Sequence, residues 1–262
     1  MRVKELQGGY RAFKAEEVLA ALSAHAKQEW TSVAESFERL IQDRQMGDGG
    51  RYRYRRFSRF MATVEDGEVG LEHLEGSSIL QSIEDNSLNG GVKRTFEPLE
   101  AEISSGLLLR ELIAHDIRVV QSVDGRLFEK PVVVGVHQVR IVALPESLGK
   151  PTPEGVHRDA EAYTFQHFWH REGIQGGEFS AYDENKNQVF RWLQTERLDS
   201  VLFTGTTWHS ASPISCSRGS EPGYRDTFLI DFNPISRSAR LPVLDQAGLR
   251  STRRKDLLLR RP

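Results

Sequence analysis

Between residues 132 and 232 the sequence consists of short apolar runs separated by turn residues. The most apolar run covers residues 131–144, and a turn rich in proline and glycine, residues 151–155, separates it from a second run at residues 163–170. Further runs of this kind follow at residues 178–183, 188–194, 201–203 and 224–232. Many short strands with turns between them are typical of a β-sandwich or a jelly roll.

The part of the chain before this region has the spacing of helices. Residues 15–44 place apolar side chains at helical intervals, with a break expected near Trp30, and residues 98–115 repeat the pattern after a proline. A chain of 262 residues can bury one sizeable core. We therefore predict a single domain of the α+β class, mainly β, with helices packed outside the sheet. Its expected parts are N-terminal helices at about 15–44, a jelly-roll core at about 50–232 and a basic C-terminal tail at 250–262.

Charge and cysteine content exclude several classes of protein. The formal charge of −2 at pH 7 gives no basic footprint of the kind that nucleic-acid-binding domains carry. A single cysteine, Cys216, excludes an internal disulfide and a cysteine-rich zinc site. The first residues contain no apolar signal segment, and no run of about 18 apolar residues is present. We expect a cytoplasmic protein with a small-molecule substrate and no nucleic-acid or membrane partner, and we leave its oligomeric state open between monomer and homodimer.

Three residues have the types and the spacing of a metal site. His157 and Asp159 come at the end of the turn, and on an extended chain two residues at this spacing point to the same side. His209 follows a later strand-like run and is the best candidate for a third ligand. Two imidazoles and one carboxylate leave other coordination positions open, which suits non-haem Fe(II) and O2 chemistry. A bare His-x-Asp triplet is more often a solvated loop, so the hypothesis depends on the residues that follow.

Arg225 and Thr227 alternate on the last expected strand and therefore share one of its faces. A guanidinium and a hydroxyl on one face can clamp a carboxylate, because arginine binds carboxylates through two parallel hydrogen bonds. A jelly roll can bring such a clamp and the metal residues into one barrel mouth. Arg218 is a rival for this role, although its neighbours indicate a loop.

An unusual segment, residues 51–60, alternates arginine with aromatic residues, as in a strand with one basic face. Three interpretations are open: arginines in water or in ion pairs, a surface that stacks single-stranded nucleic acid, and a basic lining for a small anionic substrate. The substrate-binding candidates are Arg55, Arg59, Arg140 and His167. For Arg140 a surface ion pair is an equal alternative, and for His167 a place in the core is the commoner one.

The chain resembles the Fe(II)- and 2-oxoglutarate-dependent oxygenases in His157-Arg-Asp159, His209 and Arg225-Asp-Thr227. More narrowly, it resembles the bacterial 2OG-Fe dioxygenase family, which includes L-isoleucine dioxygenase-like hydroxylases of free amino acids. The segments that carry this closer resemblance are Pro153–Asp159, Gly176-Gly-Glu178 with Tyr182-Asp183, Trp208-His209 and Arg55–Phe60.

This resemblance covers roughly residues 50–232 and implies a double-stranded β-helix (jelly-roll or cupin-like) fold. It implies Fe(II) on His157, Asp159 and His209, with the far carboxylate of the cosubstrate 2-oxoglutarate on Arg225 and Thr227 and O2 as the oxidant. The implied reaction hydroxylates an unactivated C–H bond of a free amino acid or a similar metabolite, with succinate and CO2 as co-products.

Two alternatives from other classes remain open. One is a cupin-type metalloenzyme that does not use 2-oxoglutarate, against which the pair Arg225 and Thr227 argues. The other is a non-catalytic β module that binds nucleic acid or another ligand through residues 51–59.

Overall fold

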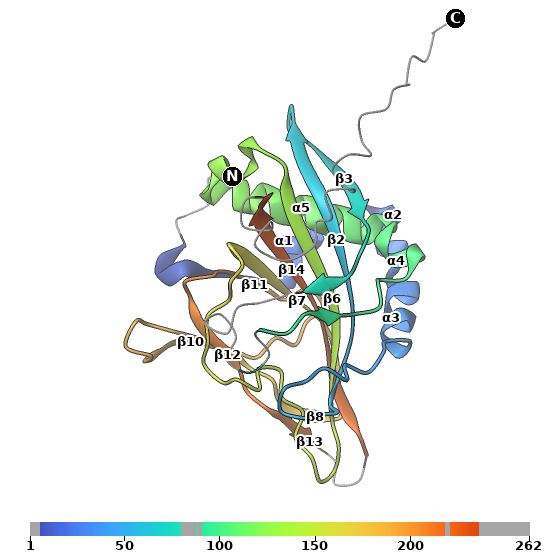
Figure 1. Cartoon of the computed structure of the whole chain (residues 1–262), viewed down its shortest axis with the longest axis vertical. Coiled ribbons are helices and arrows are strands. Elements are labelled where there is room, and N and C mark those ends of the chain that lie inside the picture. The colour runs from blue at the N-terminus through green and yellow to red at the C-terminus, as the bar shows by residue number, and fades with distance from the viewer. Residues whose placement is uncertain (1–5, 80–87, 89–90, 218–220, 236–262) are drawn as a thin grey trace, which may run out of the picture.

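A large antiparallel sheet lies between the helices and the smaller sheets in the computed structural model, which describes residues 6–79, 88, 91–217 and 221–235 (Figure 1). Its strands lie in the order β1-β11-β7-β14-β6-β2-β3. Their bounds are β1 (Tyr10–Phe13), β2 (Arg53–Glu65), β3 (Glu68–Leu74), β6 (Val132–Ala143), β7 (Tyr163–Glu172), β11 (Ser200–Thr204) and β14 (Gly223–Pro234). Each neighbouring pair is antiparallel, and the longest pairing joins β14 to β6 along both strands.

Shorter strands form the rest of the barrel. A three-stranded sheet has the order β10-β9-β12, made of β10 (Gln188–Trp192), β9 (Phe179–Tyr182) and β12 (Trp208–Ala211). Two further pairs are β8 (Ile174–Gly176) with β13 (Ile214–Cys216), and β4 (Ser78–Ile79) with β5 (Arg94–Thr95). A cavity lies between the large sheet and the three-stranded sheet, and residues of both sheets line it. This arrangement confirms the expected double-stranded β-helix.

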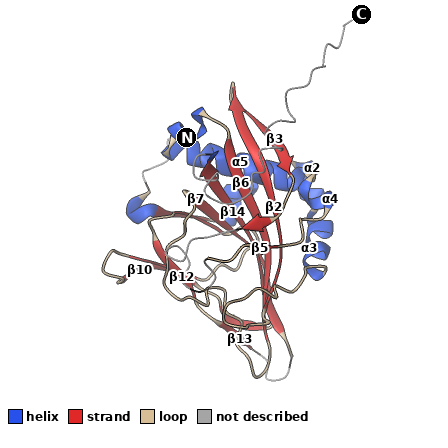
Figure 2. Cartoon of the chain, in the orientation of Figure 1, coloured by secondary structure: helices blue, strands red, loops and turns tan. Residues whose placement is uncertain are grey.

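The helices cover one face of the large sheet, as Figure 2 shows in blue beside the red strands. They are α1 (Ala15–Leu19), α2 (Ala24–Gln28), α3 (Trp30–Glu38), α4 (Ala101–Ser104) and α5 (Leu107–Val123). Two short 3-10 turns, at Gln7–Gly9 and Gly125–Glu129, accompany them. The helices therefore lie outside the sheet, as the sequence predicted.

The segment expected to hold two helices, residues 15–44, holds three shorter ones. Ser23 caps the N-terminus of α2: its Oγ accepts a hydrogen bond from the backbone N–H of Ala26 (3.1 Å), so the helical run is interrupted earlier than expected. The break predicted near Trp30 falls one residue before it, since α3 begins at Trp30. The helix predicted at residues 98–115 begins later, at Leu107, and follows the short α4.

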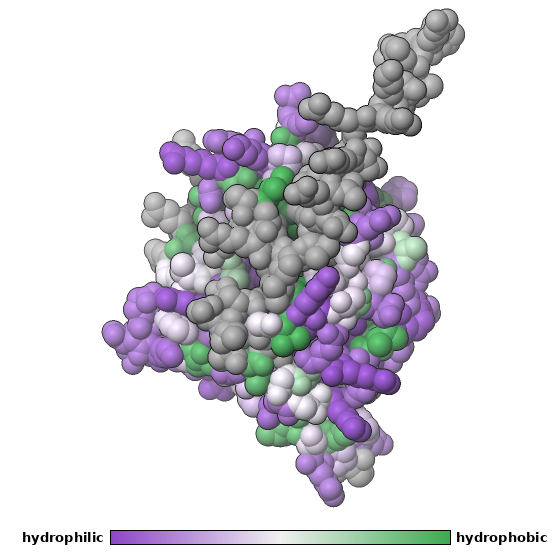
Figure 3. All heavy atoms as spheres, viewed as in Figure 1, coloured by the Kyte–Doolittle hydropathy of each residue, from purple (hydrophilic) through white to green (hydrophobic). Residues whose placement is uncertain are grey.

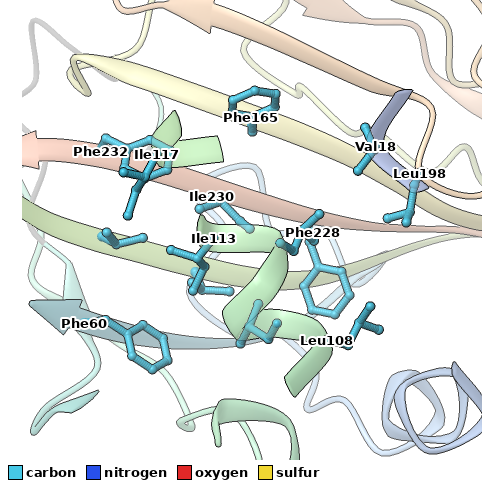
Figure 4. Packing of buried hydrophobic residues seen from close by; sticks show 14 of the residues in the cluster. Val18, Phe60, Leu108, Ile113, Ile117, Phe165, Leu198, Phe228, Ile230 and Phe232 are labelled. Carbon is cyan, nitrogen blue, oxygen red and sulfur yellow. The ribbon is translucent and has the colours of Figure 1, made fainter. Parts of the chain in front are cut away.

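Side-chain alternation gives the large sheet one apolar face and one polar face. On the apolar face Phe228, Ile230 and Phe232 of β14 pack against Ile113 and Ile117 of α5 within one core cluster (Figure 4). Residues of the opposite parity on the same strands point into the cavity between the sheets. The helices therefore bury one side of the sheet, and the other side is left for the functional site.

The strand β1 was not predicted from the sequence. Its four residues pair with β11, from Tyr10 opposite Phe203 to Phe13 opposite Ser200, and complete one edge of the large sheet. A run this short has too few residues for alternation to identify it. The basic tail expected at 250–262 lies outside the described residues.

The described surface mixes polar and apolar residues. On the face shown in Figure 3, hydrophilic and hydrophobic residues are interspersed. None of the helices in the described ranges has the length and apolar character needed to cross a membrane.

Candidate metal centre

The loop after β6 is joined to β12 by two backbone hydrogen bonds. The N–H of His157 donates to the carbonyl of His209 (3.0 Å), and the N–H of His209 donates to the carbonyl of His157 (2.9 Å). This isolated antiparallel bridge brings two residues that are distant in the chain side by side, with ring centroids 4.3 Å apart. His209 is also held by β9, because it pairs with Ala181.

The side chains of His157, Asp159 and His209 converge on one point. Each offers a ligand atom, and the three atoms lie within 4.8 Å of one another. One oxygen of Asp159 is 3.3 Å from His157 Nε2, and the other is 3.6 Å from His209 Nε2. The structure thus brings together the three residues that the sequence predicted as metal ligands.

Hydrogen bonds orient both imidazole rings. His157 Nδ1 donates to the carbonyl of Gly155 (2.9 Å), and His209 Nδ1 donates to the carbonyl of Thr207 (3.1 Å). A carbonyl can only accept, so in each ring a proton lies on Nδ1, and Nε2 is the atom that faces Asp159 and can bind a metal. Histidines that bind metals are commonly held in this way.

For each of the three predicted ligands, burial and the neighbouring charges shift the pKa in opposite directions. Burial opposes protonation of His157, but its hydrogen bond to Asp159 raises its pKa to about 9. Burial lowers the pKa of His209, which Asp159 only partly offsets. Burial also favours the neutral form of Asp159, yet the two imidazoles keep the pKa of this carboxyl below its usual value. The centre therefore holds an ionised carboxylate that can attract a cation.

Arg225 and Thr227 line the same cavity as the three predicted ligands. Both lie on β14 and point to the same side of it, as the sequence predicted. Arg225 is only 2 % exposed. Burial lowers its pKa to about 10, so the guanidinium remains charged at neutral pH. In the described ranges no carboxylate lies within ion-pair distance of it, and its Nε has no hydrogen-bond partner.

Sequence reasoning missed the residue that holds Arg225 in place. Gln194, in the loop after β10, accepts a hydrogen bond from Arg225 Nη2 (2.9 Å) and another from Gln166 Nε2 (2.6 Å). Its own amide donates to the carbonyl of Asp199 (2.7 Å). These contacts join distant parts of the chain, so no local pattern could have revealed them.

Comparison with known proteins gives the same classification as the geometry. The model of the 2OG-Fe dioxygenase family matches residues 34–231, which is most of the chain. The chain belongs to the 2OG-Fe dioxygenase family. It is an Fe(II)- and 2-oxoglutarate-dependent dioxygenase with O2 as its oxidant, and the resemblance expected from the sequence is confirmed.

Several relatives and solved structures are similar to this dioxygenase. L-isoleucine-4-hydroxylase from Bacillus thuringiensis is 23% identical over 185 residues, which cover 70% of this chain and 76% of the relative. The structure of a bsmA homolog from Methylobium petroleophilum PM1 has a TM-score of 0.75 at 24% identity and covers 86% of this chain and 88% of its own. The structure of IDO from Bacillus thuringiensis has a TM-score of 0.71 at 19% identity and covers 87% and 94%. These structures share the fold of the dioxygenase.

The arginine-rich strand of the dioxygenase, β2, faces the cavity. Arg53 and Arg55 line it, and Arg59 lines a smaller adjoining cavity, where it donates to the carbonyl of Ser78. Arg55 and Arg59 are both buried. Two of the three interpretations of this strand agree with its placement, because Arg55 lines the cavity and also forms an ion pair with Asp43 (3.1 Å). Stacking of single-stranded nucleic acid does not agree, since buried guanidinium groups offer no surface to bases.

Arg140 and His167 lie on the other face of the sheet, and the expectation that they contact substrate is corrected. Arg140 donates to both oxygens of Asp226 (2.7 and 2.8 Å) and to Glu38 of α3 (2.7 and 2.8 Å). His167 is fully buried and lies between Asp116 of α5 (2.8 Å) and Ser200 (2.7 Å). Strand alternation turns both side chains toward the helices. Arg218, the rival of Arg225, lies outside the described residues.

Proposed function

We propose that His157, Asp159 and His209 bind the Fe(II) of this dioxygenase, that Arg225 and Thr227 bind the far carboxylate of 2-oxoglutarate, and that the substrate is a free amino acid. The observation that carries the proposal is the position of Arg225, a buried cation without a carboxylate partner in the described ranges, on the wall of the cavity that holds the three ligands.

The donor set fits Fe(II). Two imidazole nitrogens and one carboxylate oxygen face a common point and leave other positions open, which is the arrangement of non-haem Fe(II) oxygenases. Both imidazoles hold a proton on Nδ1 and turn Nε2 toward the metal position. Because the hydrogen bond to Asp159 raises the pKa of His157 to about 9, a bound metal would displace the proton from its Nε2. The residues that the sequence and the structure bring together are therefore suited to this metal.

Arg225 and Thr227 fit the dicarboxylate cosubstrate. A buried guanidinium is costly unless an anion joins it, and 2-oxoglutarate would supply that anion. Gln194 fixes the guanidinium on one side through its hydrogen bond and leaves Nε without a partner in the described structure. The hydroxyl of Thr227, on the same face, can donate to the same carboxylate.

When bound, iron and 2-oxoglutarate together activate O2 for hydroxylation of a C–H bond. The residues of this chain have the tasks of holding the metal, orienting the cosubstrate and excluding water. Phe179 and Phe203 contact the ring of His209 at centroid distances of 6.0 and 4.3 Å and line the cavity beside it. These aromatic walls keep the neighbourhood of the metal apolar.

A free amino acid as substrate is supported by two observations. The similar protein from Bacillus thuringiensis is named L-isoleucine-4-hydroxylase. The cavity also contains charges of both signs beyond the metal ligands and Arg225, with Arg53 and Arg55 on one strand and Glu154 on the loop. A cupin-type enzyme that does not use 2-oxoglutarate would have no need for the buried Arg225.

The test is a screen of the Fe(II)-loaded protein with 2-oxoglutarate against the standard L-amino acids. Succinate release and product mass are measured together. We expect one amino acid, or a small group of related ones, to increase succinate release and to gain one oxygen atom. If none of them raises succinate release above the rate without substrate, the amino-acid part of the proposal is wrong.

A further inference from the structure

The cavity contains a second cationic position, separate from Arg225. Thr227 of β14 lies opposite Val139 of β6, and Val139 lies opposite Arg55 of β2. Arg55 is therefore two strands away from the cosubstrate clamp on the same inner face, which corresponds to roughly 10 Å. Val139 separates the two positions, so one carboxylate cannot occupy both.

The guanidinium of Arg55 is held in a fixed orientation. Its Nε lies 3.1 Å from Asp43 Oδ2, and its Cζ lies 3.7 Å from the centroid of the Phe96 ring. Arg55 is only 7 % exposed, and its Nη2 has no hydrogen-bond partner in the described part of the chain. A guanidinium that is buried and held in one orientation can donate hydrogen bonds to a bound carboxylate.

One acidic residue of the cavity wall also has an oxygen without a partner. Glu154 Oε1 lies 3.5 Å from His157 Nε2, whereas its Oε2 is buried and has no hydrogen-bond partner among the residues described. Asp231, another acid of the wall, accepts from Asn233 (3.2 Å) and lies 3.5 Å from His137. Glu154 is therefore better placed than Asp231 to receive a cation from a ligand.

Arg55 and Glu154 line the same cavity. Burial lowers the pKa of Arg55, and Asp43 and Glu154 both act in the opposite direction. No direct ion pair joins Glu154 to an arginine among the described residues, where its ion-pair partner is His157. A ligand with both charges could thus lie between the two side chains.

Resting on the proposed function, we infer that Arg55 binds the α-carboxylate of the amino-acid substrate and that Glu154 binds its α-ammonium group. The substrate class is then a free α-amino acid with both groups unmodified. An N-acetylated amino acid leaves Glu154 without a cation, and an amino-acid amide leaves Arg55 without an anion. Sites built to pair a polar group reject analogues that lack it, because their own buried groups are left unpaired.

The experiment measures binding of the free, N-acetylated and amidated forms of the standard L-amino acids by calorimetry, without O2, to the protein loaded with Fe(II) and 2-oxoglutarate. We expect at least one free amino acid to bind about tenfold or more tightly than either derivative. Glu154→Gln should remove the preference over the N-acetylated form, and Arg55→Lys should reduce the preference over the amide. The affinities for Fe(II) and 2-oxoglutarate should not change in either variant.

Each contrary result has a distinct meaning. If Glu161→Gln, a change to another acid of the cavity wall, removes the preference and Glu154→Gln does not, the ammonium site is wrongly assigned. If Glu154→Gln loses Fe(II), Glu154 is a metal ligand and the inference fails. If no free amino acid binds while the protein still converts 2-oxoglutarate to succinate, the inference fails and the oxygenase assignment stands. Thermal unfolding of each variant confirms that it is folded.

Discussion

His157 and His209 exchange two backbone hydrogen bonds, of 3.0 and 2.9 Å, across the mouth of the barrel. The two proposed ligands are thus fixed relative to each other by main-chain contacts and do not depend on a metal for their positions. Asp159, two residues after His157, completes the site through side-chain geometry alone. We therefore expect the protein to fold without iron and to keep the site largely formed.

Asp159→Ala should weaken Fe(II) binding by at least about 100-fold, because the site loses its only carboxylate ligand in the proposed set. The thermal unfolding temperature should change little, since Asp159 lies in a loop and not in a strand of the core. Metal titration without O2 and a thermal melt measure the two effects. Asp183→Ala, which removes a carboxylate from a hairpin turn at the surface, is the control. Wild-type iron affinity in Asp159→Ala would show that the ligand set is wrong.

Arg225→Ala should raise the apparent Michaelis constant for 2-oxoglutarate by roughly thirtyfold to several-thousandfold, as expected for a truncated charge pair worth about 2–5 kcal/mol. Arg225→Lys should recover only part of the loss, because the ammonium group of lysine cannot form the two parallel hydrogen bonds that a guanidinium makes to a carboxylate. The affinity for Fe(II) should be unchanged. A large increase in Arg218→Ala with none in Arg225→Ala would assign the role to Arg218.

His167→Gln should still bind Fe(II), since the ring of His167 lies on the helix side of the sheet between Asp116 and Ser200. The variant should lose about 1–3 kcal/mol of unfolding free energy, because a buried partner of Asp116 is removed. Denaturant unfolding measures this change. His170→Gln, at a side chain that is 47% exposed, should cost less than about 0.5 kcal/mol. Loss of iron in His167→Gln would overturn the assignment of the ligands.

Arg140→Met should destabilise the fold by about 3–5 kcal/mol, because it leaves the buried carboxylate of Asp226 without its partner. Arg39→Met, which removes an exposed arginine paired with Glu100 and Glu102, should cost at most about 1 kcal/mol. The substrate Michaelis constant of the Arg140 variant, measured at a temperature where it is folded, should equal that of the wild type. A selective increase in that constant would return Arg140 to the substrate site.

Much of the site could be predicted because its residues follow local rules. His157 with Asp159, and Arg225 with Thr227, are each two residues apart on extended chain, so their shared direction is readable from the sequence. His209 was predicted as the third ligand because it follows a later strand-like run in the chain. The structure brings all five residues to one cavity.

The remaining features depend on contacts that no local pattern contains. Alternation showed that Arg140 and Arg55 lie on strands, but it could not show which face of each strand is turned to the cavity. Gln194 and Asp43 act on arginines that are not their neighbours in the sequence. The short strand β1 is defined only by its pairing with β11.

Oxygen labelling tests the proposed reaction most directly. Isotopically labelled O2 is supplied to the Fe(II)-loaded protein with 2-oxoglutarate and the amino acid selected in the screen. We predict succinate that carries one labelled oxygen and an amino-acid product that is heavier by one oxygen atom, in equal amounts. Arg225→Ala should reduce both products together at low 2-oxoglutarate. An oxidised amino acid formed without succinate, or succinate without the label, would contradict the assignment of this chain as a 2-oxoglutarate-dependent hydroxylase.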